Sequence, residues 1–201
     1  AIESFASRNN FALKGIYVID GSKRSTKANA FFCGFGRTKK IILYDTLINQ
    51  LTIDETVAVL AHEIGHYKHH DIIKNMASSV FTMGVYLFTL SLFVGNPELS
   101  SALGFNEPSL LLSLIAFSLL ITPINIILGP ITNSLSRRAE YRADTFAANA
   151  GLGKHLVNAL KKLTANSLSP LLVHPIYVTF SLSHPTLIQR IDNINNTNNS
   201  I

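Results

Sequence analysis

Two long runs of residues without a charged side chain dominate the pattern of hydrophobic and polar positions. The first run lies between Lys74 and Glu98, and the second lies between Glu107 and Arg137. Crossing the hydrocarbon core of a bilayer takes about 20 apolar residues in a helix. We therefore predict two membrane spans, near residues 76–94 and 109–133. The alternative is a buried hairpin in a large soluble protein, but the rest of the chain is too small to enclose both runs.

The charges that flank the two runs predict an orientation. The connecting segment, Gly95–Pro108, contains two glutamates and no lysine or arginine. Basic residues flank the outer ends of the runs: Lys68, Lys74, Arg137 and Arg138. By the positive-inside rule, these outer ends face the cytosol. Two spans return the chain to its starting side, so the segments before and after them are expected to meet on one side of the membrane.

Short segments rich in β-branched and aromatic residues precede the first run and predict a small sheet. The strands are expected over Gly15–Asp20, Ala28–Gly36 and Lys40–Tyr44. Short helices are expected over residues 2–10 and 45–51. Three short strands do not make a β domain, so they indicate one small sheet within a largely helical chain.

A long helix is predicted to follow the last strand. Thr52 and Glu55 have the spacing of a capping box, in which each side chain accepts a hydrogen bond from a backbone N–H at the helix start. The helix is therefore expected to begin near Ile53. No break signal separates it from the first apolar run, so we expect it to continue into that run.

The region after the second run is also predicted to be helical. Within the run itself, Pro123 and Pro130 predict a kink or a break. Helices are expected over Ser134–Ala150, Lys154–Ala165 and Thr186–Ile194, the first of them ended by Gly151. The asparagine-rich tail, residues 193–200, is expected to fray. The predicted fold class is mainly α with a small β-sheet.

Composition supports a membrane protein and excludes several other classes. Hydrophobic residues make up 47% of the 201 residues and charged residues 14%, whereas an average soluble domain has about 25% charged residues. The single cysteine, Cys33, rules out an internal disulfide framework and a cysteine-rich zinc finger. The net charge of +5 does not predict a nucleic-acid partner, because basic residues beside membrane spans give the same excess. The chain begins at Ala1, and we expect it to be a piece of a longer protein.

One short motif in the predicted long helix carries candidate chemistry. The segment His62-Glu63-Ile64-Gly65-His66 matches H-E-x-x-H. The i, i+4 spacing places both imidazoles on one helix face, where both can bind one zinc ion. Glu63 lies in the same turn and can take a proton from water and later deliver it to a leaving amine. The alternative is a pair of surface histidines beside the membrane.

A catalytic zinc site needs a third protein ligand and an open position. The carboxylate candidates are Asp71, Glu98, Glu107, Glu140 and Asp144. Glu98 and Glu107 are expected across the membrane, and Asp71 is expected on the motif's own helix, more than a turn away. Glu140 and Asp144 lie four residues apart on a helix that returns to the same side, so one can bind zinc while the other orients a ligand histidine. Spacing leaves open which residue has which role, and an exposed helix face is the alternative for both.

These motifs together resemble peptidase family M48, a family of membrane metallopeptidases. The H-E-x-x-H motif is combined with the sequence SRRAEYRAD at residues 136–144. The sequence ANAFFCGFG at 28–36, followed by KKIILYDTL at 39–47, is similar to the CAAX prenyl protease branch rather than the heat-shock branch. The late sequence SHP at 183–185, followed by Arg190-Ile191, resembles another family segment. The resemblance runs from Ile2 to about Ile194 and corresponds to the catalytic half of longer proteins.

The resemblance implies a zincin-like (gluzincin) α+β fold, with residues 1–201 as a single peptidase domain. The two spans are then inserted between the H-E-x-x-H helix and the Glu140 helix. It also implies Glu140 as the third zinc ligand beside His62 and His66, and Asp144 as the acid that supports the ligands. Asn29 is implied in a strand alongside the substrate, His184 as a donor to the oxyanion, and Arg190 near it. Without the family, Asn29 would be interpreted as a turn residue and His184 as a helix cap.

The function implied is that of a membrane endopeptidase with one Zn²⁺ per chain, although nitrogen and oxygen ligands also accept cobalt or manganese. It would cleave near the C-terminus of prenylated CAAX-type proteins, with its active site toward the cytosol. The alternatives are a quality-control protease of the heat-shock branch and a catalytically inactive scaffold. The implied partners are a peptide or prenylated protein, the lipid bilayer and upstream transmembrane helices. The implied location is the endoplasmic reticulum and nuclear membrane of a eukaryote, or a bacterial inner membrane.

Overall fold

The computed structural model describes residues 1–23, 29–34, 39–167 and 171–199. The chain forms two compact units, which are described separately. The first unit comprises Ala1–Asp71, Arg137–His174 and His184–Ile201. The second unit comprises Ile72–Ser136 and Pro175–Ser183, and it therefore contains both apolar runs.

A small sheet lies at one side of the first unit. Its strands are β1 (Gly15–Ile19), β2 (Ala30–Cys33) and β3 (Lys40–Tyr44), in the order β1-β3-β2. β1 is parallel to β3, and β2 is antiparallel to it, with Ala30 opposite Leu43. The three predicted strands are confirmed, although Ala28, Phe35 and Gly36 of the predicted second strand lie outside the described residues. Among the described residues, β2 is an edge strand of this sheet, and it lies beside α3.

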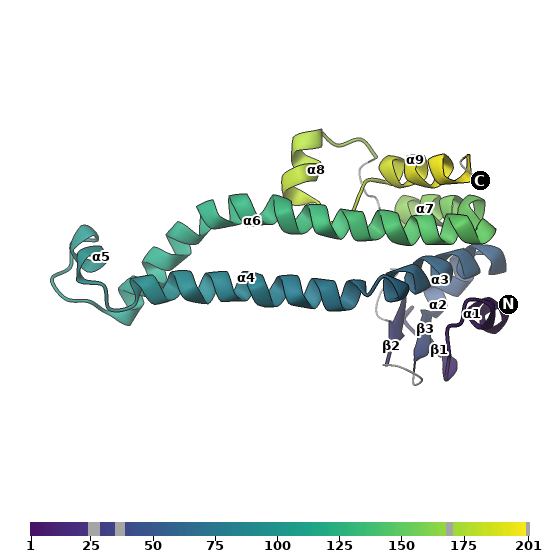
Figure 1. Cartoon of the computed structure of the whole chain (residues 1–201), viewed down its shortest axis with the longest axis horizontal. Coiled ribbons are helices and arrows are strands. Elements are labelled where there is room, and N and C mark those ends of the chain that lie inside the picture. The colour runs from purple at the N-terminus through teal and green to yellow at the C-terminus, as the bar shows by residue number, and fades with distance from the viewer. Residues whose placement is uncertain (24–28, 35–38, 168–170, 200–201) are drawn as a thin grey trace. The chain divides into compact units, whose positions relative to one another are not determined.

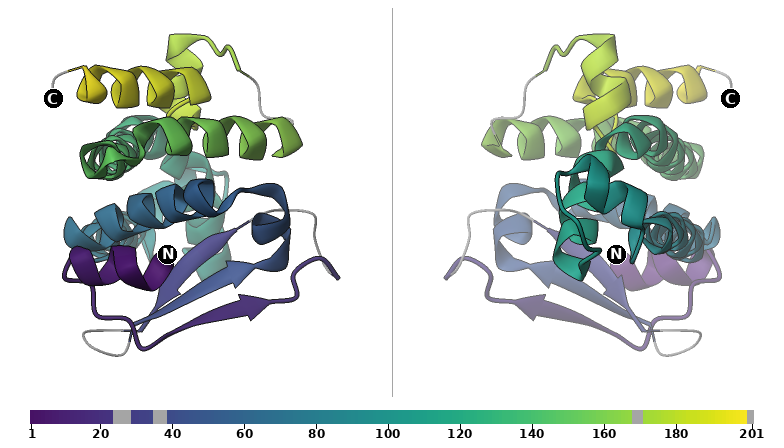
Figure 2. Two further views of the ribbon diagram at one scale, coloured as in Figure 1. Left: turned by 90° about the vertical axis from the view of Figure 1, so that its right-hand side faces the viewer. Right: turned by 90° about the vertical axis from the view of Figure 1, so that its left-hand side faces the viewer.

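Helices cover one face of this sheet in successive layers. The helices of the first unit include α1 (Ile2–Arg8), α2 (Asp45–Gln50), α3 (Ile53–Lys68), α7 (Gly153–Ser167) and α9 (Leu187–Asn198). Figure 2 shows α3 over the sheet, α7 beyond α3, and α9 outermost. Alternation along β3 buries Ile41 and Leu43 against Leu60 of α3 and Ala159 of α7. The sheet and α7 thereby fix α3 from both sides.

The predicted capping box at the start of α3 is confirmed, but the predicted continuation of this helix is wrong. The Glu55 N–H donates to Thr52 Oγ1 at 3.3 Å, and the Thr52 N–H donates to Glu55 Oε2 at 2.8 Å. α3 ends at Lys68, and a separate helix, α4 (Asp71–Phe93), begins three residues later. The break occurs because His70 adopts a left-handed conformation with φ of 55°, which a right-handed helix cannot contain.

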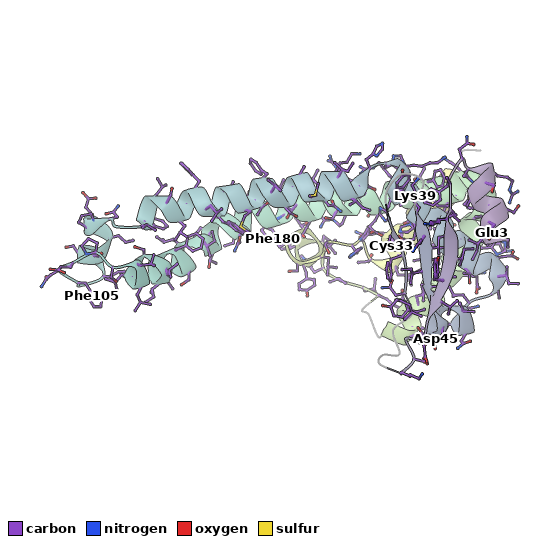
Figure 3. The ribbon with its side chains drawn as sticks, turned by 90° about the horizontal axis from the view of Figure 1, so that it is seen from below. Glu3, Cys33, Lys39, Asp45, Phe105 and Phe180 are labelled. Carbon is purple, nitrogen blue, oxygen red and sulfur yellow. The ribbon has the colours of Figure 1, made fainter. Side chains whose placement is uncertain are left out.

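The second unit is built on two apolar helices. α4 and the first part of α6 (Leu110–Ala147) run side by side, and the Tyr86 hydroxyl donates to Asn125 Oδ1 at 2.5 Å between them (Figure 1). The short helix α5 (Pro97–Ala102) lies in their connection, and Figure 3 places Phe105 at the tip of this hairpin. By length and composition, both helices suffice to cross a membrane. A further short helix, α8 (Pro175–Ser181), joins the unit where Asn133 Nδ2 donates to the Phe180 carbonyl.

α6 and α9 differ from the sequence predictions at their ends. α6 is one helix of 38 residues that continues through Pro123 and Pro130, and it is bent along its length (Figure 1). It passes into a π-helical turn, η2 (Ala148–Leu152), where Gly151 has a φ of 78° as its predicted terminating role requires. α9 is capped by Thr186 rather than His184, and it stays helical to Asn198 instead of fraying at residue 193.

Candidate metal centre

A close approach of α3 and α6 creates the site. The two helices meet at Gly65, where a Cβ atom would lie 2.9 Å from the Cα of Ala143. Any larger residue would push the helices apart, so the glycine inside the H-E-x-x-H motif has a packing role. Because of this contact, the histidines of α3 face Glu140 and Asp144 of α6.

The three predicted metal ligands lie together. His62 Nε2 is 3.1 Å from His66 Nε2. Glu140 Oε2 is 3.5 Å from His62 Nε2, and Glu140 Oε1 is 3.5 Å from His66 Nε2. Tetrahedral zinc with bonds of about 2.0–2.1 Å holds its ligand atoms about 3.4 Å apart. The two imidazole Nε2 atoms and the Glu140 carboxylate therefore fit a single divalent ion. The lone pairs of two imidazoles at this distance repel each other unless a proton or a cation lies between them.

Each of the two histidines contacts a carboxylate through its Nδ1 atom. His62 Nδ1 lies 2.8 Å from Asp144 Oδ1, which agrees with the supporting role that the family resemblance implies. His66 Nδ1 lies 3.0 Å from Asp71 Oδ2. Such contacts place the proton on Nδ1 and leave Nε2 free for a metal. Sequence reasoning set Asp71 aside because it expected an unbroken helix, and only the break at His70 brings this carboxylate back to the motif.

Arg190 of α9 joins the carboxylates of α6. Its Nε and Nη2 donate to the two oxygens of Asp144 at 2.9 and 2.6 Å, and its Nη1 lies 3.4 Å from Glu140 Oε2. Asp144 is fully buried and Glu140 is 8% exposed. A planar guanidinium is suited to this geometry, because it binds a carboxylate through two parallel hydrogen bonds. The structure thus places Arg190 in contact with the carboxylates that surround the histidines.

The remaining predicted residues line the same cavity. His184 Nδ1 lies 3.1 Å from Glu140 Oε1, and its side chain is 71% exposed. Asn29 precedes β2, where its Oδ1 accepts from the Ala30 N–H and its carbonyl accepts from the Tyr44 N–H. A cavity of about 320 Å³ is lined by Asn29, His62, Glu63, His66, Glu140, His184 and Arg190. Its other wall is apolar and consists of Ala30, Leu47, Val59, Leu156, Leu160 and Leu163.

The protonation states of the cavity residues suit acid–base chemistry beside a metal. Burial raises the pKa of Glu63, so this carboxyl group holds a proton more readily than an exposed one. Burial would also raise the pKa of Glu140, but hydrogen bonds from His184 and His66 and the charge of Arg190 hold it well below its usual range. Glu140 is therefore ionised, as a carboxylate that binds a metal has to be, and the raised pKa of Glu63 would suit a group that exchanges a proton.

Comparisons with known proteins find similar proteins along almost the whole chain. The model of peptidase family M48 matches residues 1–198. "Probable CAAX prenyl protease 1" of Schizosaccharomyces pombe is 38% identical over 198 residues, which cover 98% of this chain and 42% of that protein. "CAAX prenyl protease 1" of Saccharomyces cerevisiae is 36% identical, covering 95% of this chain and 46% of that protein. The chain spans about half the length, or slightly less, of these relatives.

A solved structure shows the same fold. The crystal structure of S. mikatae Ste24p matches with a TM-score of 0.85 and 34% sequence identity. The match covers 96% of this chain and 49% of that chain. Both described units thus have counterparts within one larger protein.

Proposed function

Because the chain belongs to peptidase family M48, we propose that it is the catalytic part of a membrane zinc endopeptidase. The proposed reaction is hydrolysis of a peptide bond near the C-terminus of prenylated CAAX-type proteins. The observation that carries this proposal is the convergence of His62, His66 and Glu140 beside Glu63 in one cavity. The names of the relatives, CAAX prenyl protease 1, support the substrate class.

The residues of the cavity divide the chemistry among them. Zinc, when bound by His62, His66 and Glu140, supplies a Lewis acid for the scissile carbonyl and acidifies water. Glu63 takes the proton of the attacking water and delivers it to the leaving amine, and its raised pKa helps it to hold that proton in between. His184 presents its exposed imidazole to the cavity and donates to the developing oxyanion. These proposed roles are those of a gluzincin.

The sheet edge is the proposed docking place for the peptide. β2 has β3 on one side and no strand on its other side among the residues that the structure describes. An extended substrate can add to this edge through backbone hydrogen bonds, with Asn29 at the start of the strand. The apolar wall of the cavity fits the aliphatic residues that follow the prenylated cysteine. Substrate pairing and side-chain selection would therefore occur on two faces of one cavity.

The membrane setting is proposed from α4 and α6. Both are long and apolar enough to span a bilayer, and the basic residues at their outer ends favour a site on the cytosolic side. Upstream transmembrane helices of a longer protein and the lipid itself would be the neighbours of these helices. The location would be the endoplasmic reticulum and nuclear membrane, or a bacterial inner membrane. Cysteine labels placed in 95–108 should react from the side opposite to labels near Arg138, and equal reactivity would contradict two spans.

The decisive test uses the full-length protein and a matched pair of peptides. One peptide carries a farnesylated cysteine and the other carries the same cysteine unmodified. We expect zinc-dependent cleavage of the farnesylated peptide with a much higher kcat/KM. Equal cleavage of both peptides would favour a general quality-control protease. Cleavage of neither by the zinc-loaded protein would favour an inactive scaffold.

A further inference from the structure

Asp71 is not one of the three candidate metal ligands, but its hydrogen bonds help to hold one of them, His66, in place. Asp71 is the first residue of α4 and is only 3% exposed. Its Oδ2 lies 3.0 Å from His66 Nδ1, and its Oδ1 accepts from Arg142 Nη2 at 2.7 Å. Arg142 comes from α6, two residues after Glu140. One buried carboxylate thus connects both helices that supply the ligands.

The chain departs from regular structure to make this contact. In a continuous helix, a residue five positions after His66 would point about 140° away from it, at roughly 100° per residue. The left-handed His70 ends α3 and turns the chain, so that Asp71 comes back to the imidazole. A non-glycine residue in this conformation is uncommon, although histidine adopts it more often than most residues do. The break between α3 and α4 is therefore what places Asp71 beside His66.

We propose that Asp71 and Arg142 form a positioning pair that fixes the tautomer and orientation of His66. An ionised carboxylate only accepts hydrogen bonds, so Asp71 requires the His66 proton to be on Nδ1 and leaves the Nε2 lone pair for the metal. Arg142 occupies Oδ1 and holds the carboxylate with Oδ2 toward the imidazole. This inference rests on the proposed metal site and assigns His66 the same kind of support that Asp144 gives His62.

The chemistry of asparagine gives a test that separates positioning from mere packing. In Asp71→Asn, the single acceptor oxygen is taken by the charged Arg142, so the amide N–H₂ faces His66. The imidazole must then accept at Nδ1 and carry its proton on Nε2, which is the wrong tautomer for this site. In Asp71→Asn/Arg142→Met, the oxygen is free to turn to His66 and restores the correct tautomer. The second substitution should therefore rescue the first.

The measurement is the zinc affinity of the full-length protein at its high-pH limit, where protons no longer compete at His66, obtained by competition with a chromophoric chelator. Loss of a hydrogen-bond partner behind a metal ligand costs about 10- to 100-fold in affinity. We expect about 100-fold weaker binding for Asp71→Asn, about 10-fold for Arg142→Met, and about 10-fold for the double variant. Asp54→Asn, which removes an exposed carboxylate of α3, is the matched control and should bind like the wild type.

The outcomes distinguish this inference from the proposed function. Wild-type affinity in Asp71→Asn, or losses that multiply to about 1,000-fold in the double variant, would overturn the positioning pair while leaving the metal site intact. A wild-type protein without zinc affinity would overturn the proposed function itself. If Asp71→Asn fails to fold, Arg142→Met decides alone, because it retains the carboxylate, and unchanged affinity there contradicts the pair.

Discussion

Protons should compete with the metal at His66, and this competition can be measured. Burial alone would lower the pKa of His66, but hydrogen bonds with Glu140 and Asp71 outweigh it and raise this pKa to about 9 in the metal-free protein. His66 is therefore protonated at neutral pH until a metal displaces the proton. Because the proton favours the metal-free state, metal affinity must rise with pH.

The size of the effect follows from that pKa. A group with a pKa of about 9 is deprotonated in only about 1% of molecules at pH 7, so the apparent affinity there is about 100-fold below its limit at high pH. Between pH 6 and 8 the zinc dissociation constant should fall about tenfold per pH unit. Glu140 does not contribute, because its pKa lies well below this window.

The assay is a chelator competition at several pH values, with the proton release measured in unbuffered solution. Glu63→Gln is measured beside the wild type, because burial raises the pKa of Glu63 and its carboxyl group could release a proton of its own. The variant removes that proton from the number released per zinc ion. We expect at least one proton released per zinc at pH 7 in both proteins. A dissociation constant that changes less than about threefold per pH unit would refute the assigned protonation of His66.

Substitutions at three further positions test the packing and the roles around the site. Gly65→Ala should separate α3 from α6. Denaturation should show a loss of about 1–3 kcal/mol in the free energy of unfolding, and chelator competition should show weaker zinc binding. His184→Ala should lower kcat by about 10²- to 10³-fold at full zinc occupancy. It should leave the N-cap of α9 intact, because Thr186 rather than His184 caps this helix. Arg190→Ala leaves the buried Asp144 without its cation and should lower the free energy of unfolding by about 3–5 kcal/mol. Arg190→Lys should recover only part of this free energy, because an ammonium group cannot bind both oxygens of Asp144 in parallel. Chemical denaturation of the metal-free Arg190→Ala and Arg190→Lys proteins measures both losses.

Features set by local spacing could be predicted from the sequence. The capping box of Thr52 and Glu55, the three strands and the H-E-x-x-H helix each depend on residues a few positions apart, and the structure contains all of them. The two apolar helices follow from composition alone. The shared cavity of Asn29 and His184 with the motif could be expected only through the family resemblance, because these residues are far apart in the chain.

Features that depend on one backbone angle or on distant contacts could not be predicted. A left-handed histidine has no sequence signal, so the break at His70 and the contact of Asp71 with His66 were missed. Pro123 and Pro130 predict either a kink or a break, and only the structure shows that α6 continues through both. The tail was expected to fray, but Asn193 Nδ2 donates to the Tyr141 carbonyl at 3.2 Å and ties α9 to α6. Such tertiary contacts override local propensity.

Glu63 is proposed to act as the proton acceptor beside a metal held by His62, His66 and Glu140. The most direct test is the turnover of Glu63→Gln on a farnesylated peptide at full zinc occupancy. Glutamine keeps the shape of the side chain and leaves the ligands unchanged, so zinc should stay stoichiometric. Loss of the base should then lower kcat by about 10²- to 10⁴-fold. A zinc-loaded Glu63→Gln protein that cleaves at the wild-type rate would contradict the role of Glu63 as the proton acceptor.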